Sequence, residues 1–250
     1  SHYYYIYTLK NLLIVVPILK DFTRSILLSN QINSSKNEEI FFPAELMYSK
    51  SSKLVQLKTI VDKEIIFPKS YPYTSSTTKI LRDNFKELYK ECSRLINLNE
   101  NDLIIDIGSN DGNLLSNFKK NHRVLGVTPE NIGNIAIKKG INTLLRYFDK
   151  KTAEIILRKF GKAKLVTATN VFAHIDNIHD LMNNLLKILD KDGFFVSESH
   201  YLTSLIQTVQ YDTIYHEHMR YYSLMSLNYL FKKYNLKIFH AKKISTHGGS

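Results

Sequence analysis

The segment 106–112 reads Asp-Ile-Gly-Ser-Asn-Asp-Gly and combines two carboxylates with two glycines. Glycine lets the backbone turn sharply and pass close to a ligand. The spacing is not the dinucleotide fingerprint G-x-G-x-x-G, because Asn110 and Asn113 stand where its second and third glycines would be, and no Gly-Lys-Ser/Thr of a phosphate-binding loop follows. Two carboxylates suit a cationic ligand, or one that offers hydroxyl and ammonium donors. For the turn alone an alternative stays open, in which Asp106 holds the loop and Asp111 caps a helix.

Two histidines at a spacing of two residues, His216 and His218, lie in the string YDTIYHEH at 211–218. They would share one face of an extended segment, and such a pair can ligate a metal ion, but no third ligand is apparent. His174 stands alone after an apolar segment. A histidine in that position is usually a hydrogen-bonded structural residue, so a site role for it depends on its neighbours.

Alternating strands and helices are predicted between residues 102 and 197 by the order of the apolar segments. A run from 103 to 107, broken only by Asp106, is typical of a strand covered on both faces. Further strands are expected at 123–127, 142–145, 164–168 and 194–197, and helices at 114–118, 129–139, 152–160 and 181–189. This alternation predicts an α/β fold with a doubly wound, mostly parallel sheet. The carboxyl ends of its strands would form one ligand-binding edge.

Three regions are expected along the chain. Residues 1–77 are predicted to form a small region of short strands, at 3–7, 12–19 and 54–57, with a polar loop at 31–39 and a turn-rich segment at 70–78. Residues 78–100 are predicted to form a linking helix, because apolar residues recur there every three or four positions. Residues 101–250 would form the sheet domain, with a sixth strand at 236–241.

Composition excludes several classes of protein. Of the 250 residues, 44% are hydrophobic and 12% aromatic, which is too many for a disordered chain. The single cysteine, Cys92, excludes a disulfide framework and favours a cytoplasmic location. The best candidate for a membrane segment, Leu12–Leu19, is shorter than the ~18 residues of a span, and we expect neither a span nor a signal peptide. The formal charge of +11 comes from scattered lysines, so no nucleic-acid partner is expected.

Four motifs occur in the same order as in a known family, namely DIGSNDGNLL at 106–115, NVFAHI at 170–175, YDTIYHEH at 211–218 and HGGS at 247–250. Together they resemble the sugar C-methyltransferases, which are class I S-adenosylmethionine enzymes with a Rossmann-like fold that act on nucleotide-linked deoxy-keto-sugars. The resemblance extends upstream through 43–57 and 71–76. S-adenosylmethionine, with its sulfonium, amino group and ribose, is also a ligand of the kind that the carboxylates of 106–112 suit.

In such enzymes a base removes the proton beside the ketone of a 4-keto sugar, and the enolate attacks the methyl group of S-adenosylmethionine. This step needs a base with a pKa near neutrality and a donor for the enolate oxygen. The resemblance implies that His218 is the base and that His174 donates to the keto oxygen. Further site residues implied are Tyr215 and Glu217 beside the base, Tyr73 near the cofactor and the sugar, and His216, Tyr222 and His247 as substrate contacts.

The resemblance also implies a binding site for the cofactor. Its methionine end would be lined by Asp106, Gly108, Asn110 and Asp111; Asn170 and Val171 would close over it, and Phe148 would approach the adenine. The second strand of such enzymes normally ends in an acid that binds both ribose hydroxyls. This chain has Thr128 there, which would bind the cofactor through one hydrogen bond, and Glu130 is expected to point into the next helix. Loss of the paired hydrogen bonds would cost about 1–3 kcal/mol, which predicts weak cofactor affinity.

Two further departures from the family shape our expectations. Ser49 and Ser52 stand where its zinc module has a Cys-x-x-Cys pair, so we expect no zinc and a loosely folded segment around them. The sequence given ends at Ser250, before the last antiparallel strand and a further sugar-binding region of the family. We therefore expect an open sheet edge that invites self-association.

Three functional hypotheses follow. The first is an S-adenosylmethionine-dependent C-methyltransferase for a nucleotide-linked 4-keto-deoxysugar. The second is a degenerate, non-catalytic family member that acts as a binding protein, which the lost cysteines and Thr128 favour. The third is a class I methyltransferase for another substrate.

Overall fold

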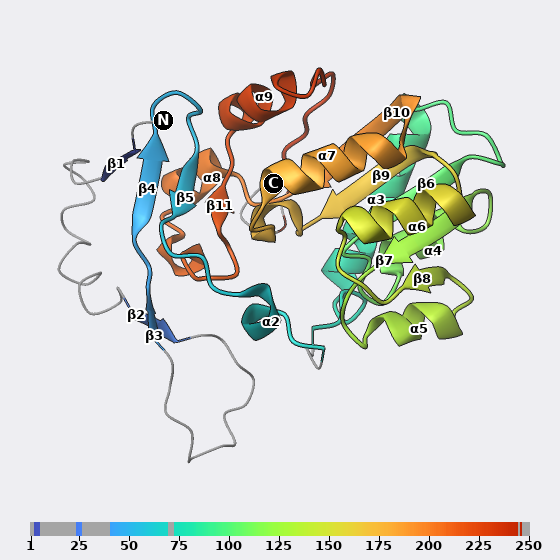
Figure 1. Ribbon diagram of the computed structural model, residues 1–250, viewed down its shortest axis with the longest axis horizontal. Helices are drawn as coiled ribbons and strands as arrows, with labels where there is room; N and C mark the ends of the chain where they lie inside the picture. Colours follow the sequence, from blue (N-terminus) through green and yellow to red (C-terminus); the bar gives the residue numbers. More distant parts are fainter. Residues whose placement is uncertain (1–2, 6–23, 27–40, 70–72, 245, 247–250) are drawn as a thin grey trace, which may run out of the picture. The chain divides into compact units, whose positions relative to one another are not determined.

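Five parallel strands form the central sheet of the computed structural model (Figure 1), which describes residues 3–5, 24–26, 41–69, 73–244 and 246. The strands are β6 (Leu103–Ile107), β7 (Arg123–Val127), β8 (Asn142–Leu144), β9 (Ala163–Thr169) and β10 (Leu189–Glu198). Their order is β10-β9-β6-β7-β8, and each neighbouring pair is parallel. The predicted α/β fold with a doubly wound, Rossmann-like sheet is confirmed.

The position of β6 in the middle of the sheet explains why its sequence is so apolar. All five of its residues are buried. Ile105 pairs with Leu125 of β7 on one side and with Val166 of β9 on the other, and the three side chains have no exposed surface. A strand in this position needs apolar side chains on both faces, because helices cover both faces of the sheet.

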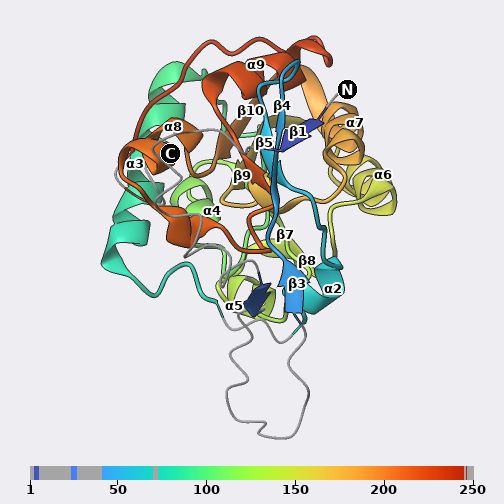
Figure 2. The same ribbon diagram turned by 90° about the vertical axis from the view of Figure 1, so that its left-hand side faces the viewer.

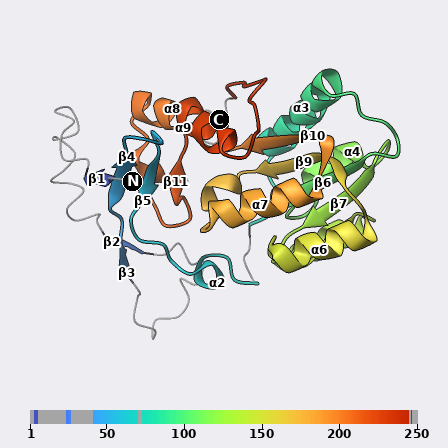
Figure 3. The same ribbon diagram turned by 45° about the horizontal axis from the view of Figure 1, so that its top comes forward.

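The helices form two layers, one on each face of the sheet. Figure 3 shows α6 (Lys150–Lys159) and α7 (Ile178–Ile188) on the face opposite to α3 (Lys79–Leu95) and α4 (Asn113–Phe118), while α5 (Gly133–Lys138) contacts β7 and β8. The core beneath α3 and α4 includes Phe85, Cys92, Leu115 and Phe118. The apolar spacing that predicted α3 is therefore the spacing of a buried face.

Three predicted boundaries differ from the structure. The helix predicted from 129 begins only at Gly133, because residues 130–132 accept hydrogen bonds from the residue three positions later, as in a turn. β10 begins at Leu189, directly after α7, and has a register irregularity before Phe194. The strand predicted at 236–241 is wrong: this segment forms no strand and has no strand neighbour among the described residues.

Backbone contacts divide the chain into two units: residues 67–199, here the sheet unit, and residues 1–66 with 200–250, here the second unit. The second unit holds a sheet of order β1-β4-β5-β11, in which β11 (Arg220–Tyr221) pairs with β5 (Val55–Leu57). This pairing, around a core that includes Leu57 and Tyr221, joins two distant parts of the sequence. The sequence-based division had instead placed residues 200–250 with the parallel sheet.

The remaining elements of the second unit are short. They are β1 (Tyr3–Tyr5), β2 (Arg24–Ile26), β3 (Phe41–Pro43), β4 (Leu46–Ser49), α2 (Lys63–Ile66), α8 (Leu202–Gln207), the 3-10 helix η2 (Tyr211–Thr213) and α9 (Leu224–Lys232). Figure 2 shows β4 and β5 side by side. The strand predicted at 12–19 and the loop at 31–39 lie outside the described residues. None of the helices in the described ranges combines the length and apolar character needed to cross a bilayer.

The two serines that replace the cysteine pair lie in the hairpin between β4 and β5. The hydroxyls of Ser49 and Ser51 are 3.2 Å apart, and the backbone nitrogen of Ser52 donates to Ser49 Oγ at 3.4 Å. The backbone nitrogen of Ser49 donates to the carbonyl of Leu54 at 2.9 Å, and Ser49 is buried. This hairpin is thus closed by hydrogen bonds of its own residues.

Candidate functional site

The turn after β6 is held against β7 by its backbone. The nitrogens of Gly108 and Ser109 donate to the carbonyl of Val127 at 2.7 and 3.2 Å. Gly108 has a φ of +76°, and a Cβ placed on it would lie 2.1 Å from Val171 Cγ2. Glycine is therefore required at position 108 both by its left-handed backbone and by the close approach of Val171.

Asp106 lies within the sheet, directly before this turn. Its carboxylate is buried and accepts a hydrogen bond of 2.6 Å from the hydroxyl of Thr167 on β9. Burial raises the pKa of Asp106 to about 7, and the bond from Thr167 offsets part of this effect. A positive charge placed beside Asp106 would favour its ionised form, so the residue is suited to a cationic ligand.

The side chains of Asn110 and Asp111 hold a separate segment, Tyr73–Ser75, over the turn. Asn110 Oδ1 accepts from the nitrogen of Ser75 and Asn110 Nδ2 donates to the carbonyl of Tyr73, both at 2.9 Å. Ser75 Oγ donates to Asp111 Oδ1 at 2.7 Å, and Lys139 Nζ lies 3.2 Å from Asp111 Oδ2. The cap residue of α4 is Gly112, and no side chain caps that end, so the proposed capping role of Asp111 is not what the structure shows.

Asp111 keeps its charge although it has no exposed surface. Burial raises its pKa, but hydrogen bonds from Ser76, Ser75 and Lys139, together with the charge of Lys139, hold the pKa below its ordinary value. Asp111 is thus a fixed negative charge beneath the turn.

A carboxylate that sequence reasoning missed, Glu198, ends β10 at the same edge of the sheet. It is 8% exposed and accepts hydrogen bonds from Asn84 Nδ2 at 3.1 and 3.0 Å and from Asn170 Nδ2 at 3.1 Å. Burial, and then the charges of Asp111 and Glu198, raise the pKa of Tyr73, which places its hydroxyl in their field. Glu198 could have been singled out in the sequence because it is a carboxylate at the end of an apolar strand.

Other predicted site residues also follow strands of the sheet unit. Thr128, after β7, is buried and donates its hydroxyl to Glu130. Phe148 is half-buried after β8, next to Asp149, the N-cap of α6. His174, after β9, makes an edge contact with the ring of Phe67 at a centroid distance of 5.6 Å.

Two buried polar atoms of the turn region, Ser109 Oγ and Asn113 Nδ2, have no hydrogen-bond partner among the described residues. Unpaired buried polar groups are costly unless a ligand satisfies them. Together with the charges of Asp106, Asp111 and Glu198, they fit a ligand that carries positive charge and its own hydrogen-bonding groups. S-adenosylmethionine meets this description.

In the second unit, His218 lies in a cluster of rings. Its Nδ1 is 2.8 Å from the carbonyl oxygen of Thr213, and its Nε2 is 3.2 Å from the hydroxyl of Tyr215. A carbonyl oxygen only accepts hydrogen bonds, so Nδ1 carries a proton. The ring of His200, another residue missed from the sequence, lies 4.5 Å from that of His218, and its Nε2 donates to the carbonyl of Arg220 at 3.1 Å.

The residues predicted to contact substrate are His216, Tyr222 and His247, and the structure describes the first two. His216 is 2% exposed; its Nε2 donates to the carbonyl of Pro43 at 3.2 Å, and burial lowers its pKa. Tyr222 is equally buried, and burial raises its pKa. Glu217 is half-buried, and His247 lies outside the described residues. His216 and His218 bind different carbonyls, and the described residues contain no group of three or more potential metal ligands.

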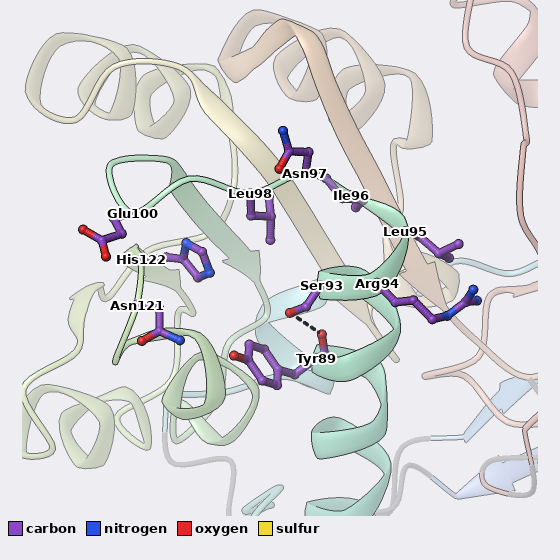
Figure 4. Close-up of a pocket in the computed structure, with 10 residues that line it drawn as sticks. All are labelled: Tyr89, Ser93, Arg94, Leu95, Ile96, Asn97, Leu98, Glu100, Asn121 and His122. Carbon is purple, nitrogen blue, oxygen red and sulfur yellow. Dashed lines mark hydrogen bonds between the residues drawn. The ribbon is translucent and has the colours of Figure 1, made fainter.

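The sheet unit also has a cavity of about 750 Å³, which is not lined by residues of the turn at 106–112 (Figure 4). It is lined by the end of α3, the following loop and the residues before β7, among them Arg94, Glu100 and His122. These segments lead into the amino ends of β6 and β7. The cavity is therefore at the sheet edge opposite to the ligand-binding edge of such folds.

Comparison with known proteins agrees with this geometry. A family model described as a methyltransferase domain matches residues 80–241. C-methyltransferase NovU of Streptomyces niveus is 33% identical over 214 residues, which are 85% of this chain and 51% of that protein, so the chain spans about half the length of this curated relative. A Haloferax volcanii complex between the Trm112 methyltransferase activator and a methyltransferase matches with a TM-score of 0.53 and 17% identity, covering 67% of this chain and 74% of the other.

The parallel sheet of order β10-β9-β6-β7-β8, with a glycine turn after its central strand, defines the class I methyltransferase fold. The chain belongs to the methyltransferase domain family.

Proposed function

We propose that the protein transfers a methyl group from S-adenosylmethionine to the carbon beside the ketone of a nucleotide-linked 4-keto-deoxysugar, through an enolate. Its similarity to a C-methyltransferase supports the type of reaction. The observation that carries the proposal is the pair of hydrogen bonds on His218, which suits this residue to act as a general base.

The bond from Nδ1 to the carbonyl of Thr213 selects one tautomer of His218. In the neutral ring, Nε2 then has a lone pair, which accepts from the Tyr215 hydroxyl. When Nε2 takes the proton from the carbon beside the ketone, the resulting imidazolium keeps its bond to Thr213. Orientation of a histidine base by a fixed acceptor on its other nitrogen is the logic of catalytic histidines in general.

We propose that the sheet unit binds the methyl donor. S-adenosylmethionine, when bound, supplies the electrophilic methyl group. The charges of Asp106, Asp111 and Glu198 would hold its positively charged portion, and the Tyr73 hydroxyl lies in the field of the last two. His174 is the donor we propose for the enolate oxygen.

The test is exchange of the proton beside the ketone with solvent deuterium, followed by NMR on a nucleotide-linked 4-keto-deoxysugar with S-adenosylhomocysteine present. Wild-type protein should catalyse exchange. His218→Gln should abolish exchange and keep the affinity for S-adenosylhomocysteine, whereas His179→Gln, at an exposed site on α7, should change neither.

Two results would contradict the proposal. Undiminished exchange in His218→Gln would show that His218 is not the base. Binding of S-adenosylhomocysteine by the wild type without exchange or methyl transfer on any such sugar would favour a non-catalytic binding protein or another substrate.

A further inference from the structure

His200 lies just before α8, in a segment that hydrogen bonds fasten to β11 and the residue after it. The Nε2 of His200 donates to the carbonyl of Arg220 at 3.1 Å, and the backbone nitrogen of Leu202 donates to the carbonyl of Tyr222 at 2.8 Å. A carbonyl oxygen only accepts hydrogen bonds, so the Nε2 of His200 carries a proton. The ring of His200 is also buried. Its position is therefore fixed by packing and by a bond to the backbone.

The ring of His200 contacts two other rings that share one hydrogen-bond acceptor. Its centroid lies 4.5 Å from that of His218 and 5.1 Å from that of Tyr221. The carbonyl of Thr213 accepts from His218 Nδ1 at 2.8 Å and from the Tyr221 hydroxyl at 3.3 Å. His200 thus packs against both of these donors, and this carbonyl is the one that selects the tautomer of His218.

The hydrogen bonds of His218 do not by themselves fix the whole ring. Nδ1 is bonded to Thr213, and Nε2 is 3.2 Å from the hydroxyl of Tyr215, but the ring can still tilt about the line that joins the two nitrogens. A neighbouring buried ring opposes such a tilt, because packed atoms leave no space to move into. The aim of the Nε2 lone pair matters, since a misplacement of about 1 Å can slow a reaction about 100-fold.

We propose that His200 is a positioning residue for His218; this inference rests on the proposed role of His218 as the base. The ring of His200 keeps Nε2 of His218 aimed at the proton beside the ketone, and the bond to Arg220 keeps the ring of His200 in place. His200 acts through His218 and is assigned no contact with the substrate. Its ring and its hydrogen-bond donor have separate tasks, which two substitutions can distinguish.

The first measurement is the proton-exchange assay at a series of sugar concentrations, combined with thermal melts. His200→Gln keeps an amide donor for Arg220 but removes the ring, so the maximal exchange rate should fall about tenfold or more with an unchanged KM. His200→Phe keeps a ring and removes the donor. It should keep most of the exchange rate but melt at a lower temperature than His200→Gln, because a buried carbonyl loses a hydrogen bond. The matched control, His179→Gln at an exposed site on α7, should change neither quantity.

The second measurement is nitrogen NMR of protein labelled in its histidine rings, at a pH at which the ring of His218 is neutral. The signals of His218 are those that disappear in His218→Gln. In the wild type they should show a proton on Nδ1 and none on Nε2, as the bond to Thr213 requires. In His200→Gln the shifts of the two nitrogens should move toward each other as tautomers mix, whereas His200→Phe should keep the wild-type pattern. This readout needs no substrate.

The outcomes separate this inference from the proposed function. A wild-type exchange rate and unchanged nitrogen shifts in His200→Gln would overturn the positioning role. Losses of exchange that follow the melting temperatures of both His200 variants would mean that His200 acts only through the stability of the fold, and would overturn it as well. Absence of exchange by the wild type would refute the proposed function, while the nitrogen shifts would still decide whether His200 orients the ring of His218.

Discussion

Substitution of Gly108 by alanine tests the architecture of the turn at 106–112 through two separable costs. The first is the left-handed backbone at φ +76°, which costs an L-residue about 1–2 kcal/mol. The second is the overlap of the new Cβ with Val171 Cγ2 at 2.1 Å, and forcing atoms into a packed site typically costs about 1–3 kcal/mol. The free energy of unfolding should therefore fall by about 2–5 kcal/mol.

The chain offers a matched control at Gly161. Its φ is +87°, and no heavy atom lies within 4 Å of a Cβ placed there. Gly161→Ala should therefore show only the backbone cost, about 1–2 kcal/mol. Urea denaturation of both variants, followed by circular dichroism, measures the two losses. Their difference is the cost of the overlap with Val171.

A double variant identifies the side chain responsible. Val171→Ala removes both methyl groups and leaves Cβ, which would lie 3.2 Å from the new atom. The Gly108→Ala/Val171→Ala variant should therefore be more stable than the sum of the single losses indicates, by about 1 kcal/mol or more. Equal losses in Gly108→Ala and Gly161→Ala, with no coupling to Val171, would refute this reasoning.

Two further predictions concern the buried carboxylates. Because burial raises the pKa of Asp106 from 3.8 to about 7, the folded state binds this proton more tightly than the unfolded chain; the free energy of unfolding should fall as the pH rises through this range. In Asp106→Asn, the free energy of unfolding, measured by urea denaturation at a series of pH values, should fall less steeply with pH. An unchanged pH dependence would contradict the assignment of this proton to Asp106. Asn84→Ala removes two hydrogen bonds to Glu198 and should cost about 1.5–3 kcal/mol, whereas Asn97→Ala, at an exposed loop position, should change stability by less than about 0.5 kcal/mol. Equal effects of these two substitutions would show that the bonds to Glu198 contribute nothing net.

The strands of the sheet could be predicted because their signal is local. A continuous apolar run such as 103–107 identifies a strand covered on both sides, whatever its neighbours are. The same kind of signal failed at 236–241, where an apolar pattern has no strand to pair with. It also placed the start of α5 too early, because the turn formed by residues 130–132 cannot be read from the spacing of apolar residues.

Within the candidate site, the turn at 106–112 was recognisable from its own residues, but the partners of those residues were not. Asn84 and Glu198 are 114 positions apart in the sequence, and Ser75 and Asp111 are 36 apart. Which side chains remain available to a ligand depends on such distant contacts. Asn110 and Asp111, predicted to line the cofactor, use their side chains to hold Tyr73–Ser75.

The fold class, the position of the glycine turn and the histidine string could be read from the sequence, because each depends on residues that are neighbours in the chain. The tautomer of His218, the raised pKa of Asp106 and the bond of Glu130 to Thr128 became visible in the folded chain. The physical reason is that tautomers, pKa values and side-chain orientations are set by burial and by hydrogen-bond partners, which exist only once strands and loops are packed together.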